Sequence, residues 1–303
     1  MSTVHAPAIP GHFLRVVDLD HDGVAATLNL AASMKARPHG FVDALRGDTV
    51  VCFFEKPSTR TRVSFAAAAE RLGMLPLVLR PDELQLGRGE TVADTARTLS
   101  GYASAIVVRT FAHETVEEIA GHATVPVINA LTDEHHPCQA LADLMTLFEH
   151  FGRLDGLRVA FVGDGNNVAR SLAEAGRLTG MEVVIAAPEG YAGSIDGAQV
   201  VTDPQEAVAG AHAVYTDAWV SMGEEAEREQ RLRELAPYQV DEKLMRRARP
   251  EAVFMHCLPA HRGEEVAAEV IDGPQSVVWQ QAENRMPTEE ALLLTLIARR
   301  WEL

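Results

Sequence analysis

The sequence predicts an α/β protein made of two doubly wound parallel-sheet domains that are joined by interdomain helices. Short apolar, β-branched runs alternate with helical segments along the chain, which is the pattern of parallel sheets with helical crossovers. A long apolar-faced helix at 138–151 interrupts this pattern, and the alternation then starts again. We therefore place a first domain at 1–140 and a second at 141–286, with a C-terminal helix at 287–303 that packs back on the first.

Each predicted domain is a series of strands separated by helices. In the first, the strands are expected at 49–54, 75–79, 105–108 and 125–129, and the helices at 22–35, 63–71, 91–99 and 116–122. In the second, the strands are expected at 157–162, 182–186, 213–216, 252–255 and 277–279, with one helix ending at 179. The C-terminal helix is expected at 288–301. A polar stretch at 81–90 predicts a mobile loop, and a charge run at 224–234 predicts a solvated helix face or mobile arm.

The junction between the first strand and its helix reads Ser58-Thr59-Arg60-Thr61-Arg62. Hydroxyl groups, free backbone N–H groups and the positive helix end converge there, which suits an anion. The two guanidinium groups can each contact two phosphate oxygens. The pattern predicts a phosphate site, although the Gly-x-x-x-x-Gly-Lys of a P-loop is absent. A capped helix with solvated arginines is the alternative.

Two more polar positions follow strand ends in the first domain. Arg109 follows the strand at 105–108, and His136-Pro137-Cys138-Gln139 comes after the strand at 125–129. Because ligands of parallel sheets bind beyond the carboxyl ends of the strands, we expect Ser58, Arg109 and His136 to converge on one ligand. A helix cap or a core histidine is the alternative for His136.

The segment Gly163-Asp164-Gly165-Asn166-Asn167 in the second domain invites comparison with a dinucleotide fingerprint. The match is incomplete, because Val168 stands where a third small residue is expected and the next strand ends without an acid to hold a ribose. A nicotinamide cofactor is therefore an alternative only. Amide side chains at a helix start can instead hold a carboxylate, and no cofactor is expected.

Composition restricts the possible partners. The 43 acidic and 27 basic residues give a formal charge of −16, which argues against nucleic acid and anionic membranes. No apolar run approaches the roughly 18 residues of a membrane span, and the first fifteen residues lack the pattern of a signal peptide. Cys52, Cys138 and Cys257 are scattered, so we expect no disulfide framework and a reducing, cytoplasmic setting.

Three other classes of protein remain open. His256-Cys257 with His261 permits a thiol nucleophile with a base, and the addition of His135, His136 and Cys138 permits a zinc site. Neither shows the usual spacing, so no metal is expected. A scaffold that only binds a partner protein is the third alternative. Such a scaffold should have lost part of the predicted anion-binding residues, and Ser58, Arg60, Arg109, His136 and Arg285 are all present.

Four features of the chain match one known pattern: the two arginine-bearing sites and the motifs His136-Pro137-Cys138-Gln139 and His256-Cys257-Leu258-Pro259. With these features the chain resembles the aspartate/ornithine carbamoyltransferase family over 53–285. Both branches of the family share the Ser-Thr-Arg-Thr-Arg and His-Pro-x-Gln patterns. Asp217-x-x-x-Ser221-Met222-Gly223 and the two motifs at 163–167 and 256–259 resemble the ornithine branch.

The resemblance implies an active site in the cleft between the domains. The residues implied for carbamoyl phosphate are Ser58, Thr59, Arg60, Thr61, Gln85, Arg109, His136, Gln139, Cys257, Leu258 and Arg285. Those implied for ornithine are Asn167, Asp217, Ser221 and Met222. Of these, the implied catalytic residues are Arg60, Arg109, His136, Cys257 and Arg285.

The implied reaction transfers a carbamoyl group from carbamoyl phosphate to the δ-amine of L-ornithine, giving L-citrulline and phosphate. It implies a role in arginine biosynthesis, with citrulline breakdown as the alternative direction and putrescine or N-acetylornithine as alternative acceptors. The family is trimeric or built of trimers, so a homotrimer is implied in which Gln85 comes from a neighbouring subunit.

Overall fold

A computed structural model describes residues 7–83, 89–220, 223 and 225–299. The chain divides into two compact units, unit 1 with Met1–Leu141 and Asn284–Leu303, and unit 2 with Ala142–Glu283. Helices α5 (Pro137–Phe151) and α11 (Val278–Ala298) each carry residues of both units. Each unit is built on one parallel sheet with helices on its faces, which confirms the predicted fold class.

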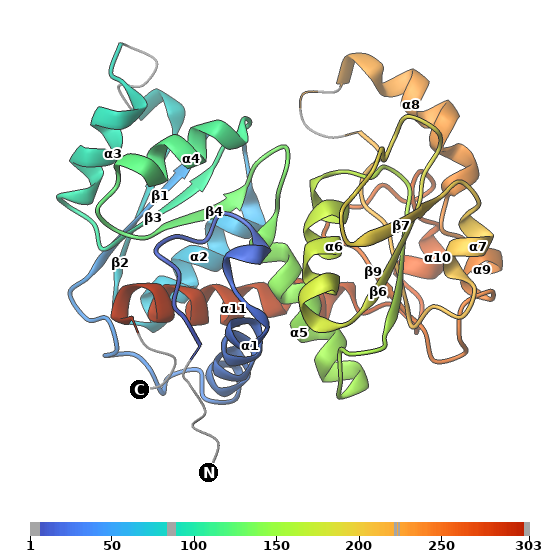
Figure 1. Cartoon of the computed structure of the whole chain (residues 1–303), viewed down its shortest axis with the longest axis horizontal. Coiled ribbons are helices and arrows are strands. Elements are labelled where there is room, and N and C mark those ends of the chain that lie inside the picture. The colour runs from blue at the N-terminus through green and yellow to red at the C-terminus, as the bar shows by residue number, and fades with distance from the viewer. Residues whose placement is uncertain (1–6, 84–88, 221–222, 224, 300–303) are drawn as a thin grey trace. The chain divides into compact units, whose positions relative to one another are not determined.

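Unit 1 contains a four-stranded sheet in the order β2-β1-β3-β4. Its strands are β1 (Thr49–Phe54), β2 (Leu75–Leu79), β3 (Ala105–Arg109) and β4 (Val127–Leu131), all parallel. Figure 1 shows α3 (Val92–Ser100) and α4 (His113–His122) on one face and α2 (Thr59–Arg71) with α11 on the other. Helix α1 (His21–Ala36) precedes β1. A buried apolar cluster on the α3–α4 face contains Phe53, Ile106 and Val108. Ile106 and Val108 are two positions apart in β3, as expected for a strand whose successive side chains point to opposite faces of the sheet.

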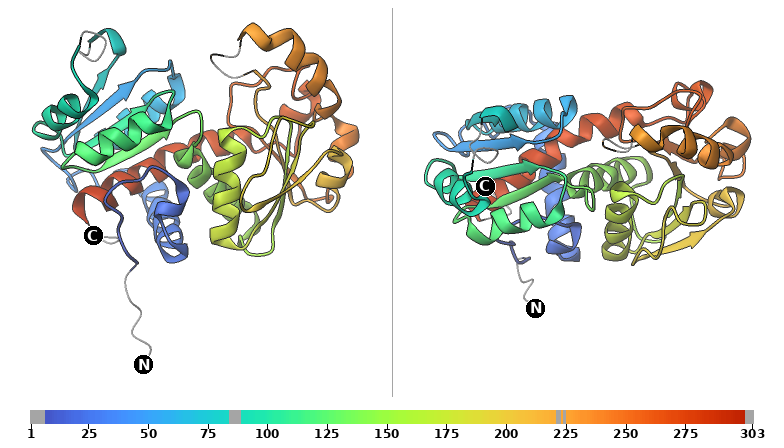
Figure 2. Two further views of the ribbon diagram at one scale, coloured as in Figure 1. Left: turned by 45° about the horizontal axis from the view of Figure 1, so that its top comes forward. Right: turned by 90° about the horizontal axis from the view of Figure 1, so that it is seen from above.

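Unit 2 contains a five-stranded sheet in the order β7-β6-β5-β8-β9. Its strands are β5 (Arg158–Val162), β6 (Glu182–Ala186), β7 (Ala198–Val201), β8 (Ala213–Tyr215) and β9 (Val253–Met255). Figure 2 shows α6 (Asn167–Thr179) on one side of the sheet and α7 (Pro204–Val208), α9 (Glu242–Met245) and α10 (Ala268–Ile271) on the other. Helix α8 (Arg228–Leu235) falls within the charge run, and most of its residues are exposed.

Several expectations about elements need correction. Helix α2 begins at Thr59 and not at 63, and α4 begins at His113 and not at 116. The strand expected at 277–279 is wrong, because α11 begins at Val278 and continues through Pro287 to Ala298. A run of three apolar residues is too short for its periodicity to separate a strand from a helix start. Strand β4 begins two residues later than expected, after Pro126, which has no N–H to give to the ladder. The short elements β7, α7, α9 and α10 are not identified in the sequence.

None of the helices in the described ranges is long and apolar enough to cross a membrane.

Helix α11 carries two adjacent buried carboxyl groups, Glu289 and Glu290, whose exposed fractions are 0% and 1%. Burial raises the pKa of each to about 7, against the opposing charges of Arg285 and Arg71 respectively. A carboxyl whose pKa is raised on folding binds more protons in the folded state. Its contribution to the free energy of unfolding therefore falls as pH rises from about 4.5, the usual glutamate range, to about 7.

Glu290→Gln should raise the melting temperature at pH 8, because the variant removes a buried charge that the folded protein tolerates poorly. At pH 5 the Glu290 carboxyl is already protonated in the folded state, so no such gain is expected. Thermal unfolding of both proteins at the two pH values checks this. An equal change at both values would contradict it.

Candidate active site

The carboxyl edge of the unit 1 sheet brings three loop segments side by side. The strand register pairs Phe54 with Arg109 and Arg109 with Leu131. Beyond the strands, the Glu55 N–H donates to the Arg109 carbonyl at 2.8 Å, and the Thr110 N–H donates to the Leu131 carbonyl at 3.0 Å. The segments that carry Ser58, Arg109 and His136 therefore begin at one edge of the sheet, as the sequence predicts.

Ser58 occupies the N-cap position of α2. Its Oγ accepts a hydrogen bond from the Thr61 N–H at 3.3 Å, so Thr59, Arg60 and Thr61 form the first helical turn. The other N–H groups of a first turn have no partner within their helix, and the helix dipole is positive there. This turn therefore offers backbone donors and a guanidinium to an anion.

Arg285 is held beside this turn by side chains from three helices. Its Nη1 donates to Gln139 Oε1 of α5 at 2.9 Å, and its Nη2 donates to Thr61 Oγ1 of α2 at 3.3 Å. On α11 itself, Nε and Nη2 both donate to Glu289 Oε1, at 3.1 and 2.6 Å. The exposed fraction of Arg285 is only 3%, so its guanidinium has little freedom to move.

His136 lies at the start of α5, where its carbonyl accepts from the Gln139 N–H at 3.1 Å. Its exposed fraction is 5%. Burial and the charges of Arg285, Arg109 and Arg60 lower the pKa of His136 well below the usual histidine range. The imidazole is therefore neutral at pH 7, and it can donate or accept a hydrogen bond without adding charge.

A second buried histidine fixes the loop that leads to His136. His113 Nδ1 lies 3.0 Å from Thr132 Oγ1, and the same hydroxyl accepts from the His135 N–H at 3.2 Å. The rings of His113 and His135 pack with centroids 4.8 Å apart. These contacts set the backbone just before His136.

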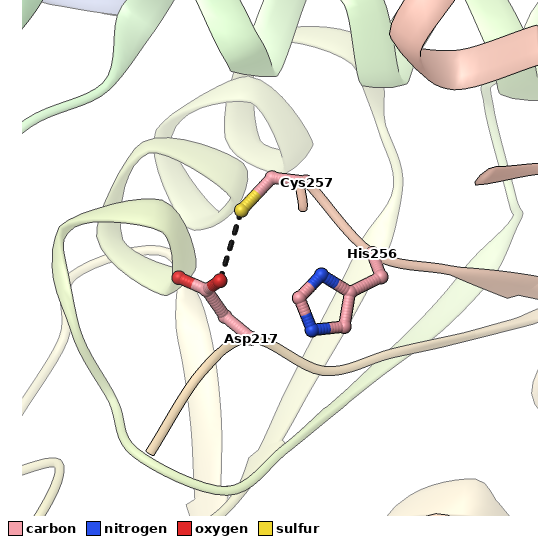
Figure 3. A group of neighbouring side chains, drawn as sticks. All are labelled: Asp217, His256 and Cys257. Carbon is pink, nitrogen blue, oxygen red and sulfur yellow. Dashed lines mark hydrogen bonds between the residues drawn. The ribbon is translucent and has the colours of Figure 1, made fainter. Parts of the chain in front are cut away.

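In unit 2, Asp217 follows β8 and is held at both oxygens. Figure 3 shows the Cys257 thiol pointing at it, and Cys257 Sγ donates to Asp217 Oδ1 at 2.9 Å. Asn166 Nδ2 donates to Asp217 Oδ2 at 2.8 Å, while Asn166 Oδ1 caps α6 by accepting from the N–H groups of Val168 and Ala169. The carboxylate is thus oriented before any ligand arrives.

The turn that carries Cys257 and Leu258 is built around His256. His256 Nδ1 accepts from the Leu258 N–H at 2.8 Å, so the ring N–H is on Nε2, which lies 3.2 Å from Glu265 Oε1. The His256 N–H donates to Gln281 Oε1 at 2.9 Å. Leu258 adopts φ 61°, a left-handed conformation that costs energy for a leucine and is often found at functional sites.

Asp217, His256 and Cys257 also form a possible metal-ligand group, since their ligand atoms lie within 4.8 Å of one another. The hydrogen bonds do not favour that use, because both ring nitrogens of His256 already have partners, Nδ1 in the Leu258 N–H and Nε2 in Glu265. In unit 1, the Cys138 thiol donates to the Asn129 carbonyl at 3.3 Å, and burial raises its pKa above the usual thiol range. A protonated thiol is a poor zinc ligand.

The glycines of the 163–167 segment have packing roles. Gly163 has φ 127°, and a Cβ there would lie 3.2 Å from Trp219 Nε1. A Cβ on Gly165 would lie 2.6 Å from Ala192 Cα. Nearby, Arg231 of α8 bonds Asp164 Oδ2 at 2.8 Å, so α8 is tied to the same segment. These contacts explain the glycines without a dinucleotide.

The structure places most of the residues that the sequence singled out. Arg285, Gln139 and Thr61 are in direct contact, and Asp217 and Cys257 are in direct contact within unit 2. Asn167 is the first residue of α6. The positions Gln85, Ser221 and Met222 lie outside the described residues.

Sequence reasoning missed Gln281 and Glu289, and it named Asn166 and His256 within motifs without giving them the supporting role that they have in these contacts. Asn166 offered a signal, because an Asn before an apolar helical segment is a typical N-cap. The spacing of Arg285 and Glu289, four positions apart on a helix, offered another.

Comparisons with known proteins match both units to one family. Residues 11–149 match the sequence model described as aspartate/ornithine carbamoyltransferase, carbamoyl-P binding domain, and residues 155–296 match the corresponding Asp/Orn binding domain. The chain belongs to the aspartate/ornithine carbamoyltransferase family. The resemblance of the sequence motifs to this family is thereby confirmed.

Several members of this carbamoyltransferase family are similar over almost their whole length. The ornithine carbamoyltransferase of Symbiobacterium thermophilum is 52% identical, over 94% of this chain and 97% of the relative. That of Bacillus subtilis is 48% identical, over 98% and 97%. The crystal structure of the ornithine carbamoyltransferase from Pyrococcus furiosus matches with a TM-score of 0.90 at 47% identity, over 97% of this chain and 98% of that one.

His136 should remain neutral from pH 6 to 8, because burial and three neighbouring arginines oppose its protonation. The ring-nitrogen NMR signals of His136, assigned by comparison with His136→Gln, should therefore not titrate in this range. A titration midpoint near 6.5 for these signals would show that the arginines do not act on His136.

Proposed function

We propose that this protein transfers the carbamoyl group of carbamoyl phosphate to the δ-amine of L-ornithine, giving L-citrulline and phosphate. The observation that carries the proposal is the buried contact of Arg285 with Gln139 and Thr61 at the first turn of α2, where the sequence places a phosphate site. The carbamoyltransferase relatives supply the reaction class, and those compared above are named ornithine carbamoyltransferases.

Unit 1 is proposed to bind carbamoyl phosphate. The helix N-terminus at Ser58–Thr61 and the guanidinium of Arg60 suit the phosphate group. Arg109 ends β3, His136 immediately precedes α5, Gln139 lies in the first turn of α5 and Arg285 lies in α11. These four residues are proposed to contact the carbamoyl oxygen and the leaving phosphate oxygen. Negative charge grows on both oxygens in the transition state, so donors that are fixed in advance supply most of the stabilisation.

Unit 2 is proposed to bind ornithine. Asp217 presents a carboxylate, held by Asn166 and Cys257, that suits a positively charged amino group. Asn167 at the start of α6 is proposed to contact the ornithine carboxylate, and Ser221 and Met222 keep their predicted roles in the same half of the site. Cys257 and Leu258 are proposed to lie next to the reacting carbamoyl group.

The setting of the reaction is also a proposal. A homotrimer, with Gln85 supplied by a neighbouring subunit, follows from the family resemblance. A role in arginine biosynthesis follows from the same resemblance. A cytoplasmic location is the simplest setting for three cysteines that all stay free, two of them buried.

The direct test is a colorimetric ureido-product assay with carbamoyl phosphate and, in parallel, ornithine, putrescine, N-acetylornithine and aspartate. Product is expected with ornithine, and Arg60→Ala should lower kcat/KM by at least about 100-fold, because a charged donor to the transition state is lost. Arg62 is exposed whereas Arg60 is half-buried, so Arg62 is not kept in the proposed phosphate site and Arg62→Ala is the matched control. Product with a different acceptor would overturn the role of Asp217, and no product with any amine would overturn the enzymatic function.

The rate should rise with pH between 6 and 9. The attacking δ-amine resembles lysine, whose pKa in solution is about 10.4, and it reacts only after losing its proton. The pH profile of kcat/KM for ornithine measures this. A flat profile across the range would indicate that deprotonation of the amine does not limit the reaction.

A further inference from the structure

Arg285 and Glu289 form the most buried ion pair of unit 1 among the pairs that the described residues make. A single carboxylate oxygen, Glu289 Oε1, accepts from both Nε and Nη2 of Arg285. The remaining donors of the guanidinium reach Gln139 and Thr61. Glu289 thus grips one edge of the guanidinium, while the other edge is directed toward residues proposed to bind carbamoyl phosphate.

We propose that Glu289 is a positioning residue for Arg285, which holds the guanidinium against Gln139 and Thr61 and takes up a proton when an anion binds beside Arg285. This inference rests on the proposed role of Arg285 in binding carbamoyl phosphate. The inference gives a reason for a buried glutamate at position 289, where packing alone would not require a carboxyl group.

The charge balance of the site explains why a carboxylate is needed. An unpaired buried guanidinium is costly, so Glu289 neutralises Arg285 while no anion is present. A bound phosphate dianion brings like charge close to the Glu289 carboxylate. Because like charge disfavours ionisation, the carboxylate should then bind a proton more strongly.

Several titratable and polar groups act on Glu289. Arg285 lies on the same helix, Ser64 comes from α2, Cys52 from β1 and Cys138 from α5. Burial raises the pKa of Cys52 to about 12 and that of Cys138 above the usual range, so both thiols stay protonated at neutral pH. His136 also stays neutral, because burial and the charges of the neighbouring arginines lower its pKa.

Within this set, Glu289 has its pKa near neutrality, raised by burial to about 7 in the absence of an anion. An anion raises this pKa further, so protonated Glu289 favours binding. The affinity for the anion should therefore be highest below pH 7 and should fall as pH rises through the pKa of Glu289.

Helix α11 supplies a matched control. Glu290 is adjacent, equally buried and has its pKa raised to about 7, but its charge partner is Arg71 rather than Arg285. A substitution at Glu290 therefore removes a similar buried carboxyl without removing the grip on Arg285.

The experiment compares Glu289→Gln, Glu289→Leu and Glu290→Gln by their KM for carbamoyl phosphate from pH 6 to 8.5, at saturating ornithine. Gln can still accept from Arg285 but cannot ionise. The KM of Glu290→Gln is divided by the KM of Glu289→Gln at each pH, so that the ionisation of the substrates cancels. This ratio should rise about tenfold from pH 6 to 8.5, which corresponds to a rise of about one unit in the pKa of Glu289 when the anion binds. Glu289→Leu, without an acceptor, should raise this KM about tenfold or more at every pH while KM for ornithine stays within about twofold.

A ratio that does not change with pH would overturn the proton uptake. Equal KM values for carbamoyl phosphate in Glu289→Leu and Glu289→Gln would overturn the positioning role, and rescue by Gln relative to Leu would support it.

A second readout does not need turnover. Calorimetric binding of inorganic phosphate at pH 7.5, in two buffers of different ionisation enthalpy, should show more protons taken up by Glu290→Gln than by Glu289→Gln. If the wild-type protein forms no ureido product but this difference is present, the proposed function fails and the role of Glu289 stands. Equal proton uptake would overturn the role of Glu289 even in an active enzyme.

Discussion

The parallel pairing of β1, β3 and β4 is the constraint on which unit 1 depends. It fixes Phe54, Arg109 and Leu131 in one row, so the chain segments that follow these strands start at the same edge of the sheet. From there, α2 begins at Thr59 and α5 at Pro137, and their first turns carry the donors of the proposed phosphate site. Parallel strands bring their carboxyl ends together by construction, which is why so many α/β enzymes place ligands there.

Electrostatics then determine the state of the side chains at this edge. Arginines that stay charged surround a histidine that stays neutral, and a buried glutamate balances the arginine that is least exposed. The same burial that makes Glu289 and Glu290 unfavourable for folding keeps Arg285 fixed in a medium of low dielectric. The buried charges lower the stability of the folded protein, but the hydrogen-bond donors of the site need no rearrangement when negative charge develops in the transition state. Unit 2 follows the same rule with Asp217, whose two oxygens are both held before a ligand binds.

Much of the fold was accessible from the sequence, because buried parallel strands are apolar runs and their helices have clear starts. The fold class and the polar strand ends at Ser58, Arg109 and His136 follow from those patterns. The misassigned strand at 277–279 shows the limit, since three apolar residues fit either a strand or the first turn of α11. The support of the site was less accessible. That Glu289 grips Arg285 is suggested by a spacing of four, but that Gln281 holds the His256 turn depends on residues 25 positions apart, which no local pattern encodes.

A crystal structure of the protein with carbamoyl phosphate bound would test the central claim most directly. We expect the phosphate on the first turn of α2, in contact with Arg60 and Arg109, and the carbamoyl oxygen within hydrogen-bonding distance of His136 or Arg285. Arg285 should keep its contacts with Gln139 and Glu289 in that complex. A ligand bound elsewhere, or one that contacts this turn only after Arg285 has left Gln139, would contradict a site that the fold prepares in advance.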